Sequence, residues 1–266
     1  MYKIAIITAQ IGAPNNPELI ITSECQKELD AYGVVVYRFN DKDVNLLKKY
    51  MQPQFTKNEI YKETFYLKFR YWFRLFFQDH QKRFPKRKNN KSRLIAKIPR
   101  MLFYKLIPED YDYFIWIDSK FTLLEGWLSY ILDIIERNND KDIMSYSHSK
   151  RKSITEEFDY MKYEMQKNEV KTLLARYNLS KMDNQVYYYI KNNQFVDNSL
   201  FETGVMIYSK NILEKKEFLE SWYAHNYYFT IQDQLSFPYI IATSKISVGV
   251  IDQSIYNTGY TRYRYH

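Results

Sequence analysis

The sequence predicts one α/β domain with a Rossmann-like, mostly parallel central sheet flanked by helices. Short apolar runs at Lys3–Thr8 and Val34–Phe39 enclose a helical stretch, which is typical of a βαβ unit. The run Tyr113–Ile117, Tyr-Phe-Ile-Trp-Ile, predicts a strand buried on both faces because it is apolar without a break. The chain has 266 residues and neither an internal repeat nor a clear linker, so we expect one domain over residues 1–266.

Turn residues and helical periodicity define the elements before the run at Tyr113–Ile117. Pro17 suits the first turn of a helix, and Gly33 suits its end. Aromatic residues recur at helical spacing after Tyr61, and a second periodic stretch follows a polar, basic loop that ends at Ser92. The helices predicted in this half of the chain span 17–32, 61–77 and 93–105.

The second half alternates short apolar runs with longer periodic stretches, which continues the α/β pattern. Ser153 and Glu156 have the spacing of a capping box, which predicts a helix that starts at that point. The residues from Tyr177 to Leu200 are rich in Asn and Tyr and fit no clear pattern. The predicted helices span 126–137, 153–177, 211–223 and 231–242, and the predicted strands span 142–146, 204–208 and 246–251.

The positive charge of the chain is concentrated in one segment. The formal net charge is +8, but residues 57–105 carry 15 Lys and Arg against 3 Asp and Glu, whereas the rest of the chain carries −4. Residues 57–92 therefore read as a basic helical insertion. An aromatic face on 61–77 lies beside the basic row Lys62, Arg70 and Arg74, which suits either an anionic membrane surface or packing onto the domain.

Composition excludes a protein stabilised by disulfides within the chain and a protein with a membrane-spanning helix. Cys25 is the one cysteine, so no disulfide forms within the chain, and it is expected to be a small buried apolar residue. No window approaches the ~18 apolar residues of a membrane span. The aromatic content is high, with 27 Tyr, 17 Phe and 4 Trp against 6 Gly, and tyrosine suits both cores and sugar faces.

Asp118 is the first candidate for function because it follows the buried strand directly. Open α/β sheets bind ligands at the carboxyl ends of their strands. Nucleotide-sugar-dependent glycosyltransferases of the single Rossmann-like type carry an Asp-x-Asp at this position. This chain reads Asp118-Ser119-Lys120, so a lysine stands where the second carboxylate would be.

Four further groups of polar residues follow predicted strands or open predicted helices. A His and an Arg at a strand exit can bind a diphosphate or a sugar acid, and a carboxylate beside a glycine can bind sugar hydroxyls. Each group also has an ordinary structural explanation, as a solvated turn or a helix cap. The groups are His148-Ser149-Lys150-Arg151, Glu202-Thr203-Gly204, Gln232-Asp233-Gln234, and Arg93 with Lys97.

The order and spacing of these groups resemble the plant-type hexosyltransferase-like family that was once known only as a domain of unknown function. Its plant members are tied to pectin and mucilage synthesis, and it has bacterial and viral relatives. The resemblance covers most of the chain and is strongest from Arg93 to Phe121, where Ile-Trp-Ile-Asp-Ser-Lys is similar to the family's Ile-Trp-Ile-Asp-Gly-Lys. Further matching positions are Ile6–Gly12, Val36–Asp41, His148, Lys150, Arg151, Glu156-Glu157, Glu202, Gly204, Asp233-Gln234, Ser236-Phe237 and Tyr265-His266.

The resemblance implies a glycosyltransferase fold of the GT-A type and a nucleotide-sugar donor, expected to be UDP-linked. Asp233 is then the expected catalytic carboxylate beside the reacting sugar. Nucleotide and diphosphate contacts are expected from Thr8, Ala9, Arg93, Lys97, Asp118 and Lys120. Sugar contacts are expected from His148, Arg151, Glu202, Thr203, Gly204 and Gln234.

The lysine at position 120 bears on the cofactor. Many such enzymes hold Mn²⁺ or Mg²⁺ between two carboxylates, whereas an ammonium group can neutralise a diphosphate directly. We therefore expect either that Lys120 replaces the metal or that a metal binds weakly through Asp118 and His266.

The acceptor, the location and two competing functions stay open at this point. The expected acceptor is a glycan or a lipid-linked glycan. The expected location is the cytoplasm, and a lipid-linked acceptor would place the protein peripherally on the inner face of the membrane. One alternative is a nucleic-acid-binding protein that uses the basic aromatic segment, although no nucleic-acid motif is present and nucleic acid is not the expected partner. The other is a glycosyltransferase-like binding protein without catalysis.

Overall fold

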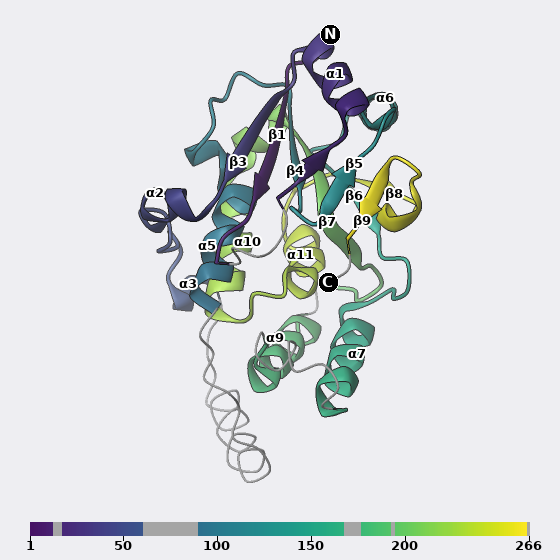
Figure 1. Ribbon diagram of the computed structural model, residues 1–266. Coiled ribbons are helices and arrows are strands. Elements are labelled where there is room, and N and C mark those ends of the chain that lie inside the picture. Colours follow the sequence, from purple (N-terminus) through teal and green to yellow (C-terminus); the bar gives the residue numbers. More distant parts are fainter. Residues whose placement is uncertain (13–17, 61–89, 168–176, 193–194, 265–266) are drawn as a thin grey trace.

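The computed structural model describes residues 1–12, 18–60, 90–167, 177–192 and 195–264 (Figure 1). A six-stranded sheet in the order β3-β1-β4-β7-β6-β8 forms its centre, and β2, β5 and β9 form a small second sheet. The strands are β1 (Ile4–Ala9), β2 (Ile20–Ile21), β3 (Val35–Phe39), β4 (Tyr113–Ile117), β5 (Phe121–Leu123), β6 (Ile143–Ser147), β7 (Phe201–Ser209), β8 (Val248–Ile251) and β9 (Thr261–Tyr263).

The central sheet is mostly parallel, as the sequence predicts. β1 pairs in parallel with both β3 and β4, and β6 pairs in parallel with β8. β7 is the exception, because it runs antiparallel between β4 and β6. The mixed α/β class with a mostly parallel sheet is therefore confirmed. The reversed strand brings the N-terminal half of β7 beside the C-terminal end of β4, where Ile117 pairs with Val205.

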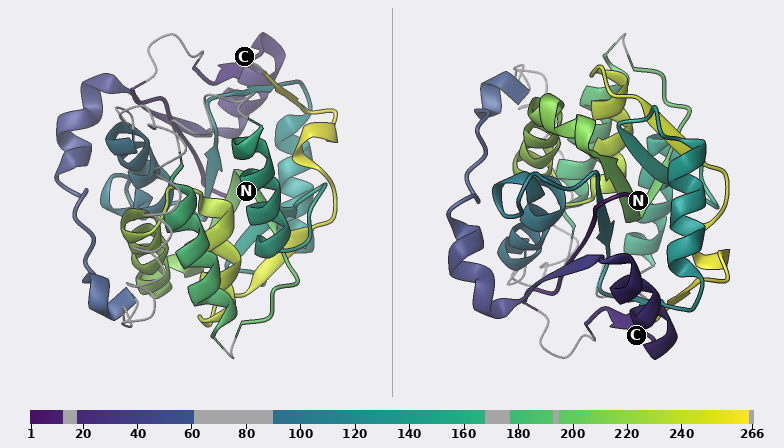
Figure 2. Two further views of the ribbon diagram at one scale, coloured as in Figure 1. Left: turned by 90° about the horizontal axis from the view of Figure 1, so that it is seen from below. Right: turned by 90° about the horizontal axis from the view of Figure 1, so that it is seen from above.

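Helices cover both faces of the sheet, which makes three layers (Figure 2). One face packs against α1 and α6, and the other packs against α5, α10 and α11. β4 shows why both faces are covered, since Phe114 and Trp116 enter one core while Ile115 and Ile117 enter the other. The α-helices are α1 (Ser23–Tyr32), α2 (Val44–Lys48), α3 (Lys57–Ile60), α5 (Asn90–Met101), α6 (Trp127–Arg137), α7 (Ile154–Gln166), α9 (Leu179–Ile190), α10 (Lys216–Tyr228) and α11 (Asp233–Ala242).

Several predicted boundaries are wrong for local reasons. The helix expected from Pro17 begins at Ser23, because Thr22 caps it and residues 20–21 instead pair with β5. The helix expected from Asn211 begins as a 3₁₀ turn over 210–215, and the α-helical part continues to Tyr228. The strand expected from Gly204 begins at Phe201, so Glu202 and Thr203 lie within β7 and not in a turn before it.

Part of the basic segment falls outside the described residues. The predicted helix 61–77 lies there, as does most of the insertion expected over 57–92, so its roles at a membrane or a nucleic acid stay predictions. The described ends of that segment are α3 and the first residues of α5. Within the described ranges, no helix is both long and apolar enough to cross a bilayer.

Many of the tyrosines pack together in the helical layer formed by α9, α10 and α11. The rings of Tyr189 and Tyr239 stack with their centroids 4.0 Å apart. The hydroxyl of Tyr189 lies 2.7 Å from Nδ1 of His225, which is buried. Burial lowers the pKa of His225 to about 3, so this imidazole is neutral in the folded protein at ordinary pH.

We expect the protein to lose stability in mild acid because of His225. The unfolded chain binds a proton at this residue near its ordinary pKa and the folded chain does not, so stability is full above that pKa and falls as the pH drops below it. The free energy of unfolding should fall by about 1 kcal/mol between pH 7 and pH 5.5 from this residue. Urea unfolding at the two pH values measures the change, and an NMR titration of His225 is the control. Equal stabilities at both values would contradict the prediction.

Candidate functional site

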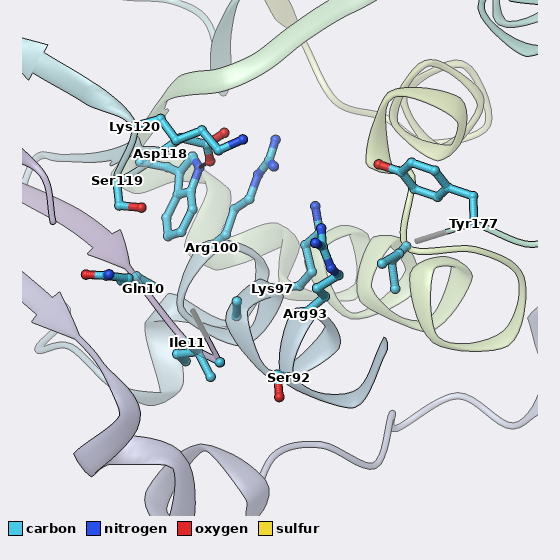
Figure 3. Close-up of a pocket in the computed structure, with 15 residues that line it drawn as sticks. Gln10, Ile11, Ser92, Arg93, Lys97, Arg100, Asp118, Ser119, Lys120 and Tyr177 are labelled. Atoms are coloured by element: carbon cyan, nitrogen blue, oxygen red, sulfur yellow. Dashed lines mark hydrogen bonds between the residues drawn. The ribbon is translucent and has the colours of Figure 1, made fainter. Parts of the chain in front are cut away.

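A cavity of about 210 Å³ opens at the C-terminal ends of β1 and β4 and faces α5 (Figure 3). This is the edge of the sheet at which open α/β folds bind ligands. The side chains of Arg93, Lys97 and Arg100 extend from α5 toward the side on which Asp118 and Lys120 lie. The lining residues are Ala9, Gln10, Ile11, Gly12, Ser92, Arg93, Ala96, Lys97, Arg100, Trp116, Asp118, Ser119, Lys120, Tyr177 and Ile231.

Asp118 is fixed by its backbone and by its side chain. Its N–H donates to the carbonyl of Gly204 on β7 at 2.8 Å, and its Oδ1 accepts from the indole N–H of Trp116 at 2.9 Å. Burial raises the pKa of this carboxyl above its ordinary value, and the nearby Arg100 and Lys97 oppose that shift. A Cβ at position 204 would lie 3.0 Å from the ring of Phe121 and 3.6 Å from Asp118, so glycine keeps this approach open.

Three cationic residues on α5 share one face because they are spaced by four and then three positions. They are Arg93, Lys97 and Arg100. Arg100 is almost fully buried, and its guanidinium lies over the rings of Trp116 and Trp222, at 5.8 and 5.1 Å from the centroids. Two aromatic faces therefore hold this charge beside the cavity.

Asp233, the first residue of α11, pairs with two of these cations. Its Oδ2 accepts from Nζ of Lys97 at 2.6 Å and also from Nη1 of Arg100. Asp233 is 6% exposed and does not itself line the cavity. Burial would raise the pKa of this carboxyl, but Arg100 and Lys97 outweigh burial and hold it below its ordinary value. Asp233 is therefore ionised, and its charge is shared between the buried Arg100 and the partly buried Lys97.

The loop from Asp118 to Phe121 is held by the end of the described chain. Nη2 of Arg264 donates to the carbonyls of Ser119 and Glu18, each at 2.6 Å, and to that of Phe121 at 3.2 Å. The backbone N–H of Arg264 donates to the carbonyl of Lys120 at 3.0 Å. Nζ of Lys120 lies 3.5 Å from the hydroxyl of Tyr263. One arginine thus fixes the backbone that carries Asp118 and Lys120.

Two of the residues expected to contact a sugar, Arg151 and Gln234, belong to a hydrogen-bonded chain next to Asp233. Arg151 pairs with Glu157, which accepts from Nε2 of Gln232 at 3.0 Å. Nε2 of Gln232 also donates to Oε1 of Gln234 at 2.9 Å. Burial raises the pKa of Glu157, and Arg151 opposes that shift. Because Gln232 and Gln234 flank Asp233, this polar chain adjoins the cations of α5.

His148 and Glu202 are engaged with their own protein. Nδ1 of His148 accepts from the backbone N–H groups of Lys150 and Arg151, each at 3.1 Å. Burial, with Arg151 beside it, lowers the pKa of His148 to about 4, so the ring is neutral at pH 7. One oxygen of Glu202 accepts from the N–H of Ser149 at 3.1 Å and from its hydroxyl at 2.7 Å, and the other accepts from the N–H of Ile255 at 3.0 Å. Glu202 thus ties β7 to two loops.

The remaining expected residues lie at different depths. Ala9 lines the cavity, whereas Thr8 and Thr203 are buried in the sheet and lie outside its lining. The hydroxyl of Thr8 has no hydrogen-bond partner among the described residues. His266 lies outside the described residues, so its expected role with a metal stays a prediction.

The described side chains do not fit a divalent cation well. A Mg²⁺ or Mn²⁺ site takes mainly carboxylate and other oxygen ligands. Asp118 is the only carboxylate among the described residues that line the cavity, and four cationic side chains line it as well. Nowhere in the described ranges do three His, Cys, Asp or Glu side chains come together as a metal site would require.

Sequence reasoning did not single out several of these residues. Arg100 follows Lys97 by three positions, so the helical spacing that paired Arg93 with Lys97 would have included it. Trp116 precedes Asp118 by two positions, and strand alternation puts both on one face. Tyr177 and Gln10 carried no such signal, because only the tertiary fold brings their segments to the cavity.

One protein family matches more than half of the chain. The family described as TOD1/MUCI70, glycosyltransferase-like domain, matches residues 85–257. The match contains α5, Asp118, the polar chain from Arg151 to Gln234, and Asp233. No curated protein sequence matches the chain significantly.

Several solved structures resemble the chain at low identity. Mouse xyloside xylosyltransferase 1 has 12% identity and a TM-score of 0.43, over 94% of this chain and 85% of that one. A glycosyltransferase involved in glycosylation of the major capsid of PBCV-1 has 12% identity and a TM-score of 0.36, over 94% and 82%. Core-mannan synthase A from Aspergillus fumigatus, solved with Mn and GDP, has 9% identity and a TM-score of 0.41, over 94% and 73%.

We expect Arg264 to be a positioning residue for the cavity. Arg264→Ala removes the donors that hold the carbonyls of Ser119 and Phe121, so Asp118 and Lys120 lose their fixed placement. Affinity for UDP, measured by calorimetry, should fall about tenfold. The control is Arg262→Ala, an exposed arginine on β9 two residues before Arg264, which should bind UDP normally. Unchanged affinity in Arg264→Ala, in a protein with a normal melting temperature, would refute this role.

Proposed function

Because the chain belongs to the TOD1/MUCI70 glycosyltransferase-like family, we propose that it is a hexosyltransferase that uses a UDP-linked sugar donor. The acceptor in this proposal is a glycan or a lipid-linked glycan. Family membership confirms the resemblance drawn from the motifs, and together with the sheet it bears out a glycosyltransferase fold of the GT-A type. The donor, the acceptor and the roles of single residues belong to the proposal.

The charge around the cavity is the observation that supports a sugar-nucleotide donor. Among the described residues, four cationic side chains line it, one carboxylate lines it, and a second carboxylate pairs with two of the cations, so the formal charges of these groups sum to +2. A nucleoside diphosphate sugar carries two negative charges on its diphosphate. Arginine and lysine are the side chains that bind phosphate best, as a planar fork and as a point charge. The cations are Arg93, Lys97, Arg100 and Lys120, and the carboxylates are Asp118 and Asp233.

The reaction we propose is a displacement at the anomeric carbon of the donor. An acceptor hydroxyl oxygen forms the new glycosidic bond, and the bond from that carbon to the β-phosphate oxygen breaks. The bonding electron pair leaves with UDP, and the proton of the acceptor hydroxyl passes to solvent water. Charge therefore develops on the diphosphate, which Lys97 and Lys120 are suited to stabilise.

The contacts seen in the structure favour a sugar-binding role for some of the expected residues more than for others. Arg151 and Gln234 belong to the polar chain that adjoins Asp233, so a bound sugar could exchange hydrogen bonds with that chain. The carboxylate of Glu202 already accepts three hydrogen bonds from the protein, which favours a role in shaping the site. A cytoplasmic location, peripheral on the inner face of the membrane, follows only if the acceptor is lipid-linked.

Binding of the donor should not require a metal. With excess EDTA, UDP should bind with unchanged affinity, because Lys120 occupies the position of a second metal-binding carboxylate. Lys120→Gln should weaken that affinity about tenfold. Calorimetry with UDP measures both effects, and Lys152→Gln, an exposed lysine outside the cavity, is the matched control.

Two outcomes would count against the proposal, one from that calorimetry and one from an activity assay with UDP-sugars. Complete loss of UDP binding in EDTA, with recovery on adding Mn²⁺, would show that a metal ion and not Lys120 binds the diphosphate. Tight UDP binding without transfer or hydrolysis of any UDP-sugar would favour a binding protein that has lost catalysis.

Asp233→Asn separates two roles for this carboxylate. The sequence led us to expect that it contacts the reacting sugar, so that the variant would lose transfer and still bind nucleotide. Its contacts with Lys97 and Arg100 lead us to expect instead that UDP affinity also falls, about tenfold, because both cations lose their partner. UDP calorimetry and a donor-hydrolysis assay are needed together, with the melting temperature as a control for folding. Normal UDP affinity with lost hydrolysis would restore the sugar-contact role.

A further inference from the structure

A second cavity, of about 370 Å³, lies beside the first. It is bounded by the start of α5, the start of α9 and the end of α10. Tyr177 and Ile231 line both cavities, so they form a shared wall. Tyr177 is held there because its hydroxyl donates to Oε1 of Gln232 at 2.8 Å. The lining residues are Met51, Lys91, Leu94, Tyr177, Asn178, Lys181, Asn226, Tyr227, Phe229, Thr230 and Ile231.

The chemistry of this cavity differs from that of the first. Lys91 and Lys181 supply its charge, and no carboxylate stands among the described residues that line it. Aromatic rings from Tyr177, Tyr227 and Phe229 supply flat apolar surface, which suits the face of a sugar ring. The combination favours a sugar that carries a negative charge.

Asn226 adds a polar group that the protein leaves unsatisfied. It is 1% exposed, and its Nδ2 donates to the carbonyl of Trp222 and to the hydroxyl of Ser236, both at 3.0 Å. Its Oδ1 has no hydrogen-bond partner among the described residues. Buried acceptors are usually satisfied, but this oxygen has almost no accessible surface, so it is a polar atom within the cavity wall and not a contact for a ligand.

We propose that this second cavity is the acceptor subsite and that it binds an acceptor sugar bearing a carboxylate or a phosphate. The inference rests on the proposed function, since a transferase must bring two substrates together. The two cavities adjoin each other at Tyr177 and Ile231, so an acceptor bound in the second would lie next to a donor bound in the first. Lys91 and Lys181 pair with the anionic group, and Tyr227 packs on the ring.

An array of immobilised oligosaccharides tests the inference, because it samples many candidate acceptors at once. It carries oligosaccharides with uronic-acid ends, with phosphorylated ends and with neutral ends, and the labelled protein is applied with saturating UDP. The wild-type protein should bind acidic ends at least about tenfold more tightly than neutral ends. The uronic-acid and phosphorylated arms distinguish the two sources of charge.

Two variants locate the binding to this cavity. Lys181→Gln removes one charge, and Tyr227→Leu removes the ring while keeping apolar volume; each should lower array binding about tenfold and leave UDP affinity unchanged. The matched control is Lys191→Gln, an exposed lysine at the other end of α9 that does not line the cavity.

The outcomes separate this inference from the proposed function. Failure of the wild-type protein to bind UDP would refute the proposed function itself. Normal UDP binding would leave that function unaffected by the result of the array. The acceptor subsite would then be refuted by equal or better binding of neutral ends, by the absence of any bound glycan, or by full binding of both variants.

Discussion

The pairing of Asp233 with Lys97 and Arg100 is the interaction on which the site depends. It joins the start of α11 to the middle of α5, two elements separated by more than a hundred residues in the chain. Buried charges are tolerated when they are paired, and removing one partner leaves the others uncompensated. One carboxylate here serves two cations, so the cluster keeps an excess of positive charge on the side that faces Asp118. The same contact therefore holds α11 against α5 and determines the charge that the cavity presents.

Residues 231–234 connect every part of the site. Ile231 lines both cavities. Gln232 accepts a hydrogen bond from the hydroxyl of Tyr177 and donates one to Glu157. Asp233 pairs with the cations of α5. A shift of this short segment would therefore reach both cavities and the polar chain together. Such contiguous contacts are the physical basis on which occupation of one subsite can affect another.

The sequence predicted the central strand and its carboxylate because both depend on local patterns. An apolar run that ends at an aspartate indicates a buried strand with a polar tip, and Asp118 does line a cavity at that edge. The spacing of Arg100 from Lys97 predicts only a shared helix face, because the contacts that hold its guanidinium come from Trp116, Trp222 and Asp233, which the helix pattern does not contain. The antiparallel direction of β7 could not be predicted either, since the apolar pattern of a fully buried strand does not depend on the direction in which the strand runs.

Arg264 contacts the loop beside the cavity, whereas Met1 is exposed at the opposite end of the sheet. The first strand starts at the far end of the sheet, where Met1 is 86% exposed, whereas Arg264 rests against the loop that carries Asp118 and Lys120 (Figure 1). A polypeptide fused directly after Arg264 therefore begins beside the loop whose residues Asp118 and Lys120 line the first cavity. Purification tags, fluorescent reporters and surface-immobilisation linkers therefore belong at the amino terminus, where they leave the entrance to the cavity unobstructed.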